Sequence, residues 1–139
     1  MQDRYLFRAK RIDNGEWVQG HLITDEQDEK KCFIAYIFGT DEDGQPHDID
    51  SALVELSTIC QCTGLKDKNG KLIWENDVVK GKYWEYGHSH RHIGAVKYIS
   101  SEFKVVGVKQ YRGYNAELTG VFEVIGNKFD NPELLEVQE

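Results

Sequence analysis

The stretch from Thr63 to Val79 reads TGLKDKNGKLIWENDVV and has the most definite folding pattern in the chain. Its Asn69-Gly70 pair is typical of a tight turn, because both residues tolerate positive φ. The residues that follow alternate along an expected strand, which makes Trp74 a candidate core anchor. The stretch contains no evident nucleophile, metal-ligand set or phosphate-binding glycine pattern. We therefore interpret it as an element that builds the fold rather than a site of chemistry.

An N-terminal antiparallel hairpin is expected from residues 4–24, where two alternating apolar segments flank Asn14-Gly15. That dipeptide suits a type I′ turn, in which both central residues have positive φ. The charged segment 25–31 and the Asp- and Gly-rich segment 39–51 are expected to be surface loops. The apolar run between them, residues 32–38, is expected to be a buried strand.

Further strands are expected within residues 68–84, 94–100, 102–110 and 120–127. Many short strands separated by turn residues predict a mainly β chain, either a barrel or a partly open sheet. Asn131 as N-cap and Pro132 at the first helical position predict a short C-terminal helical turn. We expect two parts, a β-rich N-terminal region over residues 1–57 and a C-terminal barrel over residues 58–139.

Composition favours a cytoplasmic protein. The N-terminus shows no apolar signal segment, and the longest apolar run has seven residues, too few to span a bilayer. Three cysteines without a secretion signal indicate reduced thiols. A net charge of −7 argues against non-specific binding to membranes or nucleic acid. The charge is uneven, however, because residues 80–115 contain seven basic and two acidic residues, a net +5, which leaves −12 for the remainder.

Three blocks together resemble the YopX family of phage and prophage proteins: YLFRAKRIDNGEWVQGHL near the start, TGLKDKNGKLIWENDVV in the middle and FEVIGNKFDNPELLE at the end. They follow the family's order and span nearly the whole chain. The resemblance implies a mostly β protein with a small SH3-like barrel in its C-terminal part. It also implies a phage or prophage origin and a tendency to self-associate. It implies no catalytic residue and no cofactor.

The chain departs from the family pattern at two places. The family usually has glycine where this chain has Asn76. Asparagine tolerates the left-handed region better than other non-glycine residues, so Asn76 is expected to form the same turn. The family usually has Gly-Gln-Tyr-Thr-Gly where this chain has cysteines at Cys60 and Cys62. The cysteines are thus local variants, which argues against an essential role for them.

A metal site is one hypothesis for the segment that contains His88, His90 and His92. Residues two apart on an extended chain face the same way, so three imidazoles would line one side. Imidazole binds zinc, nickel and copper, and Cys60 and Cys62 would add ligands if they lay nearby. The favoured alternative is an exposed hairpin tip, because glycines flank the segment and its spacing matches no structural zinc motif.

A binding surface is the second hypothesis, centred on the basic and aromatic segment 80–115. Aromatic and basic side chains on a small barrel can stack bases and hold phosphates. Alternatively, the aromatics belong to the core, and the basic face meets an acidic face of another subunit or lies in solvent. The candidate binding residues are Lys80, Lys82, Tyr83, Trp84, Arg91, Lys97 and Lys109.

No catalytic residue is predicted. The serines lack a Gly-x-Ser-x-Gly context, and the sequence has no phosphate loop or dinucleotide-binding pattern. We therefore expect a non-enzymatic protein. Together with what the YopX resemblance implies, this gives a phage accessory protein of the host bacterial cytoplasm that forms homo-oligomers or binds a phage or host protein. A nucleic-acid-binding module that uses residues 80–115 is the alternative, and no membrane association is expected.

Overall fold

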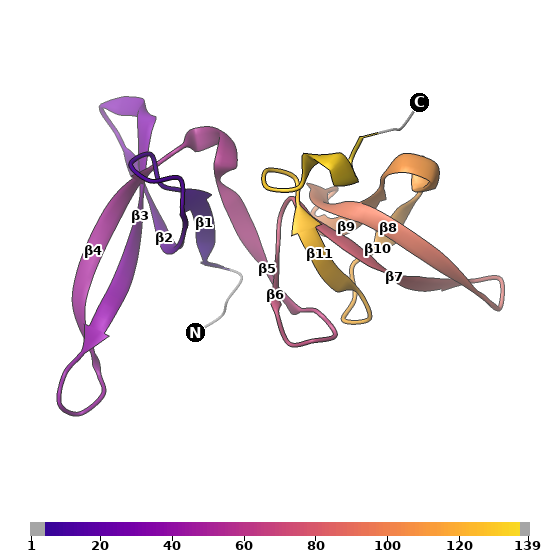
Figure 1. Cartoon of the computed structure of the whole chain (residues 1–139), viewed down its shortest axis with the longest axis horizontal. Helices are drawn as coiled ribbons and strands as arrows, with labels where there is room; N and C mark the ends of the chain where they lie inside the picture. The colour runs from indigo at the N-terminus through magenta and orange to yellow at the C-terminus, as the bar shows by residue number, and fades with distance from the viewer. Residues whose placement is uncertain (1–4, 137–139) are drawn as a thin grey trace. The chain divides into compact units, whose positions relative to one another are not determined.

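The computed structural model describes residues 5–136, and the chain divides into two compact units, Met1–Cys62 and Thr63–Glu139. Both units consist mainly of antiparallel strands (Figure 1). The sequence placed the boundary after residue 57, whereas the structure places it within strand β5 (Cys60–Lys66). Within residues 5–136, no helix is both long and apolar enough to cross a membrane.

The first unit is a twisted antiparallel sheet in the order β4-β3-β2-β1, followed by the start of β5. Its core lies on one face and contains Ala9, Cys32, Ile34 and Val54, each at most 4% exposed. A short 3-10 helix, η2 (Leu56–Thr58), leads from the last long strand into β5. The four strands before it are β1 (Phe7–Lys10), β2 (Trp17–Asp25), β3 (Asp28–Thr40) and β4 (Pro46–Val54).

The connection between β1 and β2 differs from the type I′ turn that Asn14-Gly15 predicted. Only Gly15 has a positive φ, of 73°, and the loop is closed by hydrogen bonds between the backbones of Arg11 and Glu16 and from Gly15 to Arg11. The side chain of Asn14 instead accepts a hydrogen bond from the N–H of Glu16. Asparagine's ability to bond the backbone two residues ahead thus decides the turn.

Two segments expected to be loops are largely strand. β2 and β3 extend through most of residues 25–31, and β3 and β4 extend through most of residues 39–51. Asp25 pairs with Asp28, and Thr40 pairs with Pro46, so both connections are short. Charge and polarity did not prevent strand formation here, because the pairing with a neighbouring strand supplies the backbone hydrogen bonds.

The second unit contains a five-stranded antiparallel sheet in the order β10-β9-β8-β7-β11. The order has two ends, so the sheet formed by the described residues is open and the expected SH3-like barrel is not confirmed. Its strands are β7 (Asp77–Glu85), β8 (His88–Ile99), β9 (Glu102–Gly107), β10 (Asn115–Glu117) and β11 (Glu123–Asn127). The unit also contains β6 (Leu72–Trp74) and the 3-10 helices η3 (Lys109–Tyr111) and η4 (Pro132–Leu134).

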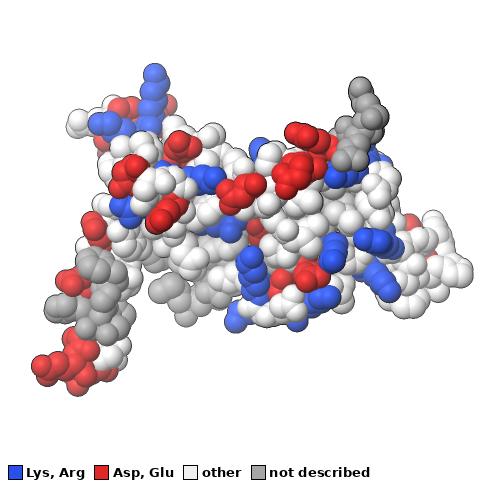
Figure 2. Space-filling model, viewed as in Figure 1, with Lys and Arg blue, Asp and Glu red and all other residues white. Residues whose placement is uncertain are grey.

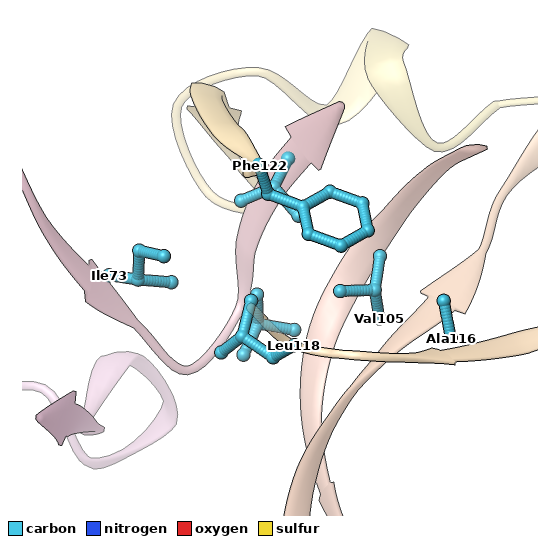
Figure 3. Packing of buried hydrophobic residues seen from close by; sticks show 7 residues of the cluster. Ile73, Val105, Ala116, Leu118 and Phe122 are labelled. Atoms are coloured by element: carbon cyan, nitrogen blue, oxygen red, sulfur yellow. The ribbon is translucent and has the colours of Figure 1, made fainter. Parts of the chain in front are cut away.

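The main buried cluster of the second unit is aliphatic apart from Phe122. Phe122, 1% exposed, packs with buried side chains from β7, β8 and β9 and from the segment around Leu118 (Figure 3). The buried members are Ile73, Val79, Val96, Val105, Ala116, Leu118 and Phe122.

The stretch 63–79 builds this unit as its sequence indicated. Gly70 has φ 82° and Asn76 has φ 71°, and Trp74 is 3% exposed. The N–H of Trp74 donates a hydrogen bond of 2.8 Å to the buried carboxylate of Asp77. The backbone of Asn76 hydrogen-bonds to Val96 and Lys128, and its side-chain oxygen accepts a hydrogen bond of 2.6 Å from Nζ of Lys97. The sequence therefore identified the positive-φ turns at Gly70 and Asn76 and the buried Trp74, but not the positive φ of 82° at Gly64 within β5.

The C-terminal helical turn is confirmed as η4, with Pro132 at its first position and Asn131 at the N-cap. The cap itself differs from the prediction, because the side chain of Asn131 makes no hydrogen bond to the helix. Its oxygen instead accepts a hydrogen bond of 3.1 Å from the N–H of Asn127, at the end of β11. Asn131 therefore closes the loop that precedes the turn.

Candidate functional site

An open groove of about 1020 Å³ lies within the second unit, and we call it the basic groove. It is formed by parts of β7, β8, β10 and β11, with Tyr114, the residues on either side of Gly120 and the turn before β6. Figure 2 shows Lys and Arg gathering over part of this unit, while Asp and Glu dominate the tip of β3 and β4. The groove is lined by Lys68, Lys80, Gly81, Lys82, Tyr83, Trp84, Ser89, Arg91, Tyr114, Glu117, Thr119, Val121 and Glu123.

The cations of the groove come mainly from one face of the β7–β8 hairpin. Lys80, Lys82 and Trp84 alternate along β7, and side chains two residues apart on a strand share a face. Arg91 on β8 lies directly opposite Lys82 in the antiparallel register. The hairpin therefore presents three cations and one indole side by side, and the turn at Lys68 adds a fourth cation.

Lys82 and Arg91 lie opposite each other without an ion pair to any acidic side chain that the structure describes. Like charges directly opposite each other on neighbouring strands are destabilising. Across residues 5–136, neither Lys82 nor Arg91 forms an ion pair. The sheet contains a second such pair, Lys97 opposite Lys104, but there Lys104 forms an ion pair of 3.3 Å with Glu102. The groove thus keeps an uncompensated positive charge that the same sheet neutralises elsewhere.

One wall of the groove is acidic. Glu123 lies 3.5 Å from Nζ of Lys68 and 3.8 Å from Nζ of Lys80, so it partly neutralises those two cations. Glu117 on β10 is exposed at the same groove. The free positive charge is therefore concentrated at Lys82 and Arg91.

Aromatic rings form the remaining wall. The rings of Tyr83 and Tyr114 stack with their centroids 4.4 Å apart, and His90 stacks on Tyr83 at 5.2 Å. The side chain of Trp84 is 75% exposed, although an indole of that size is normally buried or covered. Burial raises the pKa of the Tyr114 hydroxyl, and the nearby Glu85 adds to the increase. Tyr114 therefore enters the groove as a neutral phenol.

Five of the seven predicted binding residues line this groove, namely Lys80, Lys82, Tyr83, Trp84 and Arg91. The other two do not. Lys97 donates its hydrogen bond to Asn76, and Lys109 lies in η3 with a φ of 54°. The sequence had no way to separate these two lysines, because both belong to the same basic segment.

Residues 88–92 lie within β8, so the expected hairpin tip is wrong in position. The tip is Tyr86-Gly87, where φ is 52° and 78°. His88, His90 and His92 do alternate on one face, as the metal hypothesis required. His92 is 1% exposed, however, and its Nε2 lies 3.0 Å from the carbonyl oxygen of Val105. That nitrogen is thus used in the fold rather than offered to a ligand.

The cysteines lie in the first unit, where Cys60 and Cys62 are fully buried. The thiol of Cys60 donates a hydrogen bond of 3.2 Å to the carbonyl oxygen of Thr58. No group of three or more His, Cys, Asp or Glu side chains in the described part of the chain is placed to hold a metal ion. The metal site at the three histidines stays a prediction.

Sequence reasoning missed Lys68, Tyr114 and both glutamates of the groove. These residues come from outside β7 and β8 and reach the groove only through the fold. Lys68 lies in the tight turn before β6, whose sequence indicated folding alone. Sequence patterns report which residues share a strand, not which distant segments meet.

A second candidate surface lies in the first unit, on the sheet face opposite its core. The register places Ile23 opposite Phe33, Phe33 opposite Leu53, and Ile37 opposite Ile49, so all five share one face. We call these five residues the apolar face. Ile23 is 47% exposed, Ile37 52% and Ile49 76%. Ala35 and Ser51 lie between the Ile23–Phe33–Leu53 row and the Ile37–Ile49 pair. Exposed apolar side chains gathered on one face can mark interaction sites.

The comparison with protein families identifies the chain. The family model described as YopX protein matches residues 6–136. The chain belongs to the YopX family. None of the curated proteins compared with it matches. Among solved structures, it is similar to the crystal structure of protein EF1440 from Enterococcus faecalis. The two chains are 24% identical, the TM-score is 0.51, and the match covers 94% of this chain and 96% of the other. That similarity supports the fold of this YopX family member.

Proposed function

We propose that this YopX family member is a non-enzymatic binding protein that self-associates through the apolar face. The supporting observation is the set of four exposed aliphatic side chains, with the half-buried Phe33, on one face of β2, β3 and β4. Each exposed aliphatic residue loses contact with water when two such faces meet, and burial of apolar area is the main driving force of association.

A second copy of the chain is the occupant that fits this face. A two-fold interface brings the same patch of two subunits together, so the patch must complement itself. The five residues of the apolar face are uncharged, and two copies therefore meet without opposing like charges. Two sheets packed face to face are a common arrangement for such surfaces.

Pairing through the edge strand is less suitable than this face-to-face packing. β4 is the edge of the sheet, but its opposite face carries the exposed Asp48 and Asp50. Charged side chains on an edge strand oppose pairing with another chain. The first unit contains six basic and thirteen acidic residues, so its net charge is −7. Screening of the repulsion between two such units should make association tighter as salt is raised.

Size-exclusion chromatography with light scattering tests the proposal. We expect a mass of two or more chains for the wild type and the mass of one chain for Ile49→Glu. Thr24→Glu is the matched control, because Thr24 is exposed on the other face of the same sheet. A wild-type monomer at all concentrations and salts, or equal disruption by both variants, would contradict the proposal.

The family resemblance also supports a role as a bacteriophage or prophage accessory protein in the cytoplasm of the host bacterium, with a phage or host protein as a further partner. A pull-down from phage-infected cells with wild type and Ile49→Glu tests that role. The SH3-like description of the second unit stays a proposal as well, and superposition of an experimental structure on SH3 domains tests it.

A further inference from the structure

We propose that the basic groove of the second unit binds single-stranded nucleic acid. This inference is separate from self-association, because it uses a different unit, different residues and the opposite response to salt. It depends on three features of the groove: an uncompensated pair of cations, an exposed indole beside them, and the distribution of charge between the two units.

The Lys82–Arg91 pair supplies the contact for phosphate. Two cations held opposite each other repel until an anion lies between them, and across residues 5–136 no carboxylate of this chain does so. A phosphate group bound by both side chains would relieve that repulsion. Arginine also bonds phosphate through two parallel N–H groups, which fixes the orientation of the phosphate.

The aromatic residues favour a nucleic acid over an acidic peptide. Trp84 shares the face of Lys82, lies two residues farther along β7 and is 75% exposed. Positions two apart on a strand are separated by about 6.7 Å, so an indole and a phosphate-binding cation lie side by side. Stacking of bases on aromatic side chains combined with basic contacts to the backbone is typical of single-strand binding. An acidic peptide would use the cations but not the indole.

The net charge of −7 does not exclude this ligand. All of that excess lies in residues 1–62, since residues 63–139 contain eleven basic and eleven acidic residues. Within this neutral unit, residues 80–115 have a net charge of +5. The acidic wall at Glu117 and Glu123 confines the positive potential to the Lys82–Arg91 side. A narrow positive strip of this kind suits one strand better than a duplex with two charged backbones.

Fluorescence anisotropy with labelled oligonucleotides tests the proposal on the full chain. The probes are oligothymidine and oligouridine of about 15 nucleotides, within the site sizes of small single-strand binders. We expect saturable binding at about 50 mM salt that weakens steeply toward about 200 mM, with a log–log slope of about −0.7 for each phosphate contacted. A blunt duplex of the same length should bind more weakly.

Matched variants identify the residues that bind. The double variant Lys82→Gln/Arg91→Gln should reduce the steepness of the salt slope by about 1.4, the value for two lost phosphate contacts. Lys104→Gln/Arg112→Gln removes the same two charge types outside the groove and should leave the slope unchanged. Trp84→Ala should weaken binding about fivefold or more, with recovery in Trp84→Phe. Tyr86→Ala, at an aromatic residue 91% exposed on the hairpin tip, is its control.

Three results would overturn the inference. The first is no binding of either oligonucleotide at about 50 mM salt. The second is equal weakening by the groove variant and by its charge-matched control, which would indicate a response to net charge alone. The third is tighter binding of a labelled polyglutamate peptide, lost in Lys82→Gln/Arg91→Gln but kept in Trp84→Ala. That result would assign the groove to an acidic protein segment instead. Circular dichroism melts of each variant confirm that it is folded.

Discussion

The N–H of Val124 donates a hydrogen bond of 3.0 Å to Oδ2 of Asp67, across 57 positions of sequence. The other oxygen of Asp67 accepts hydrogen bonds of 2.9 Å from the N–H groups of Asn69 and Lys71. The carboxylate is 6% exposed, so three backbone donors converge on a buried anion. One side chain therefore shapes the turn before β6 and fastens it to β11.

Asp67→Asn tests this role. An amide offers one accepting oxygen and places N–H donors where the second oxygen was, so a backbone donor loses its partner. We expect a loss of about 2–3 kcal/mol in the free energy of unfolding, the range for a buried donor left without its charged acceptor. Urea unfolding followed by fluorescence measures this loss.

The chain contains its own control for Asp67→Asn. The turn at Asp41 has the same local pattern, in which Oδ1 accepts from the N–H groups of Asp43 and Gln45. Asp41 is exposed, and the hydrogen bonds that its carboxylate accepts within the described part of the chain come from its own turn. Asp41→Asn should therefore cost less than about 1 kcal/mol. Equal costs at the two positions would show that the long-range bond contributes nothing.

Asp67 also determines how stability should change at acidic pH. Burial alone would raise the pKa of Asp67, but the hydrogen bonds from Val124, Lys71 and Asn69 outweigh it and lower the pKa below its ordinary value. A lowered pKa stabilises the folded state above the unfolded value of about 3.9, and this contribution is lost as pH falls through the folded value. Stability should drop below about pH 4 in wild type and less in Asp67→Asn. Thermal melts between about pH 2 and 6 measure the difference.

Gly70 allows a test of backbone conformation without steric contact. Its φ is 82°, and among the described residues no atom outside Gly70 and its two chain neighbours lies within 4 Å of the position that a Cβ would occupy. Any cost of substitution therefore comes from the backbone. A β-branched residue is strongly disfavoured at this φ, so Gly70→Val should cost about 2 kcal/mol, whereas Gly70→Asn should cost under about 1 kcal/mol. Thermal melts that place both variants at the wild-type midpoint would refute this argument.

Trp74 is a packing test of the same stretch. Its side chain is 3% exposed, so Trp74→Ala should destabilise the chain by about 3–5 kcal/mol, the usual loss when a buried large aromatic is truncated. Trp84→Ala is the matched control, because the same substitution at a side chain 75% exposed removes little packing. The difference between the two losses in the free energy of unfolding, measured by denaturant unfolding, gives the contribution of burial. Similar midpoints would mean that Trp74 is not a core anchor.

The turns and the core of the second unit could be predicted because local chemistry determines them. Gly70 and Asn76 occupy positive φ, and few other residue types do so at low cost. Trp74 is buried as its apolar context indicated, but the adjacent Ile73 is buried too, so the alternation did not separate a core face from an outer face. At Asn14 a type I′ turn competes with a turn in which the Asn14 side chain accepts a hydrogen bond from the N–H of Glu16. There the sequence indicated a turn but not its type.

The rest depended on contacts between distant segments. β3 and β4 extend into polar residues because each supplies the other's backbone partners, which hydropathy does not report. The groove joins Lys68, Tyr114 and Glu123 to the predicted β7 and β8 residues, although up to 55 positions separate them. The pairing of Lys82 with Arg91 requires the exact strand register, which the turn Tyr86-Gly87 sets.

The final prediction concerns Tyr114 and the loss of stability at alkaline pH. Burial, with the nearby Glu85 adding to it, raises the pKa of its hydroxyl above the ordinary value of 10.0. A raised pKa means that ionisation costs more in the folded chain than in the unfolded one. Its contribution to stability is therefore complete below about pH 10 and is lost as pH rises through the folded value.

Tyr114→Phe removes this loss while keeping the ring stack on Tyr83 at 4.4 Å. Stability measured between about pH 8 and 11 should fall less steeply in the variant than in wild type. Tyr86→Phe, at a side chain 91% exposed, controls for the removal of one phenol from the chain. If stability falls as steeply with rising pH in Tyr114→Phe as in wild type, the hydroxyl of Tyr114 is hydrated in the groove and its pKa is not raised by burial.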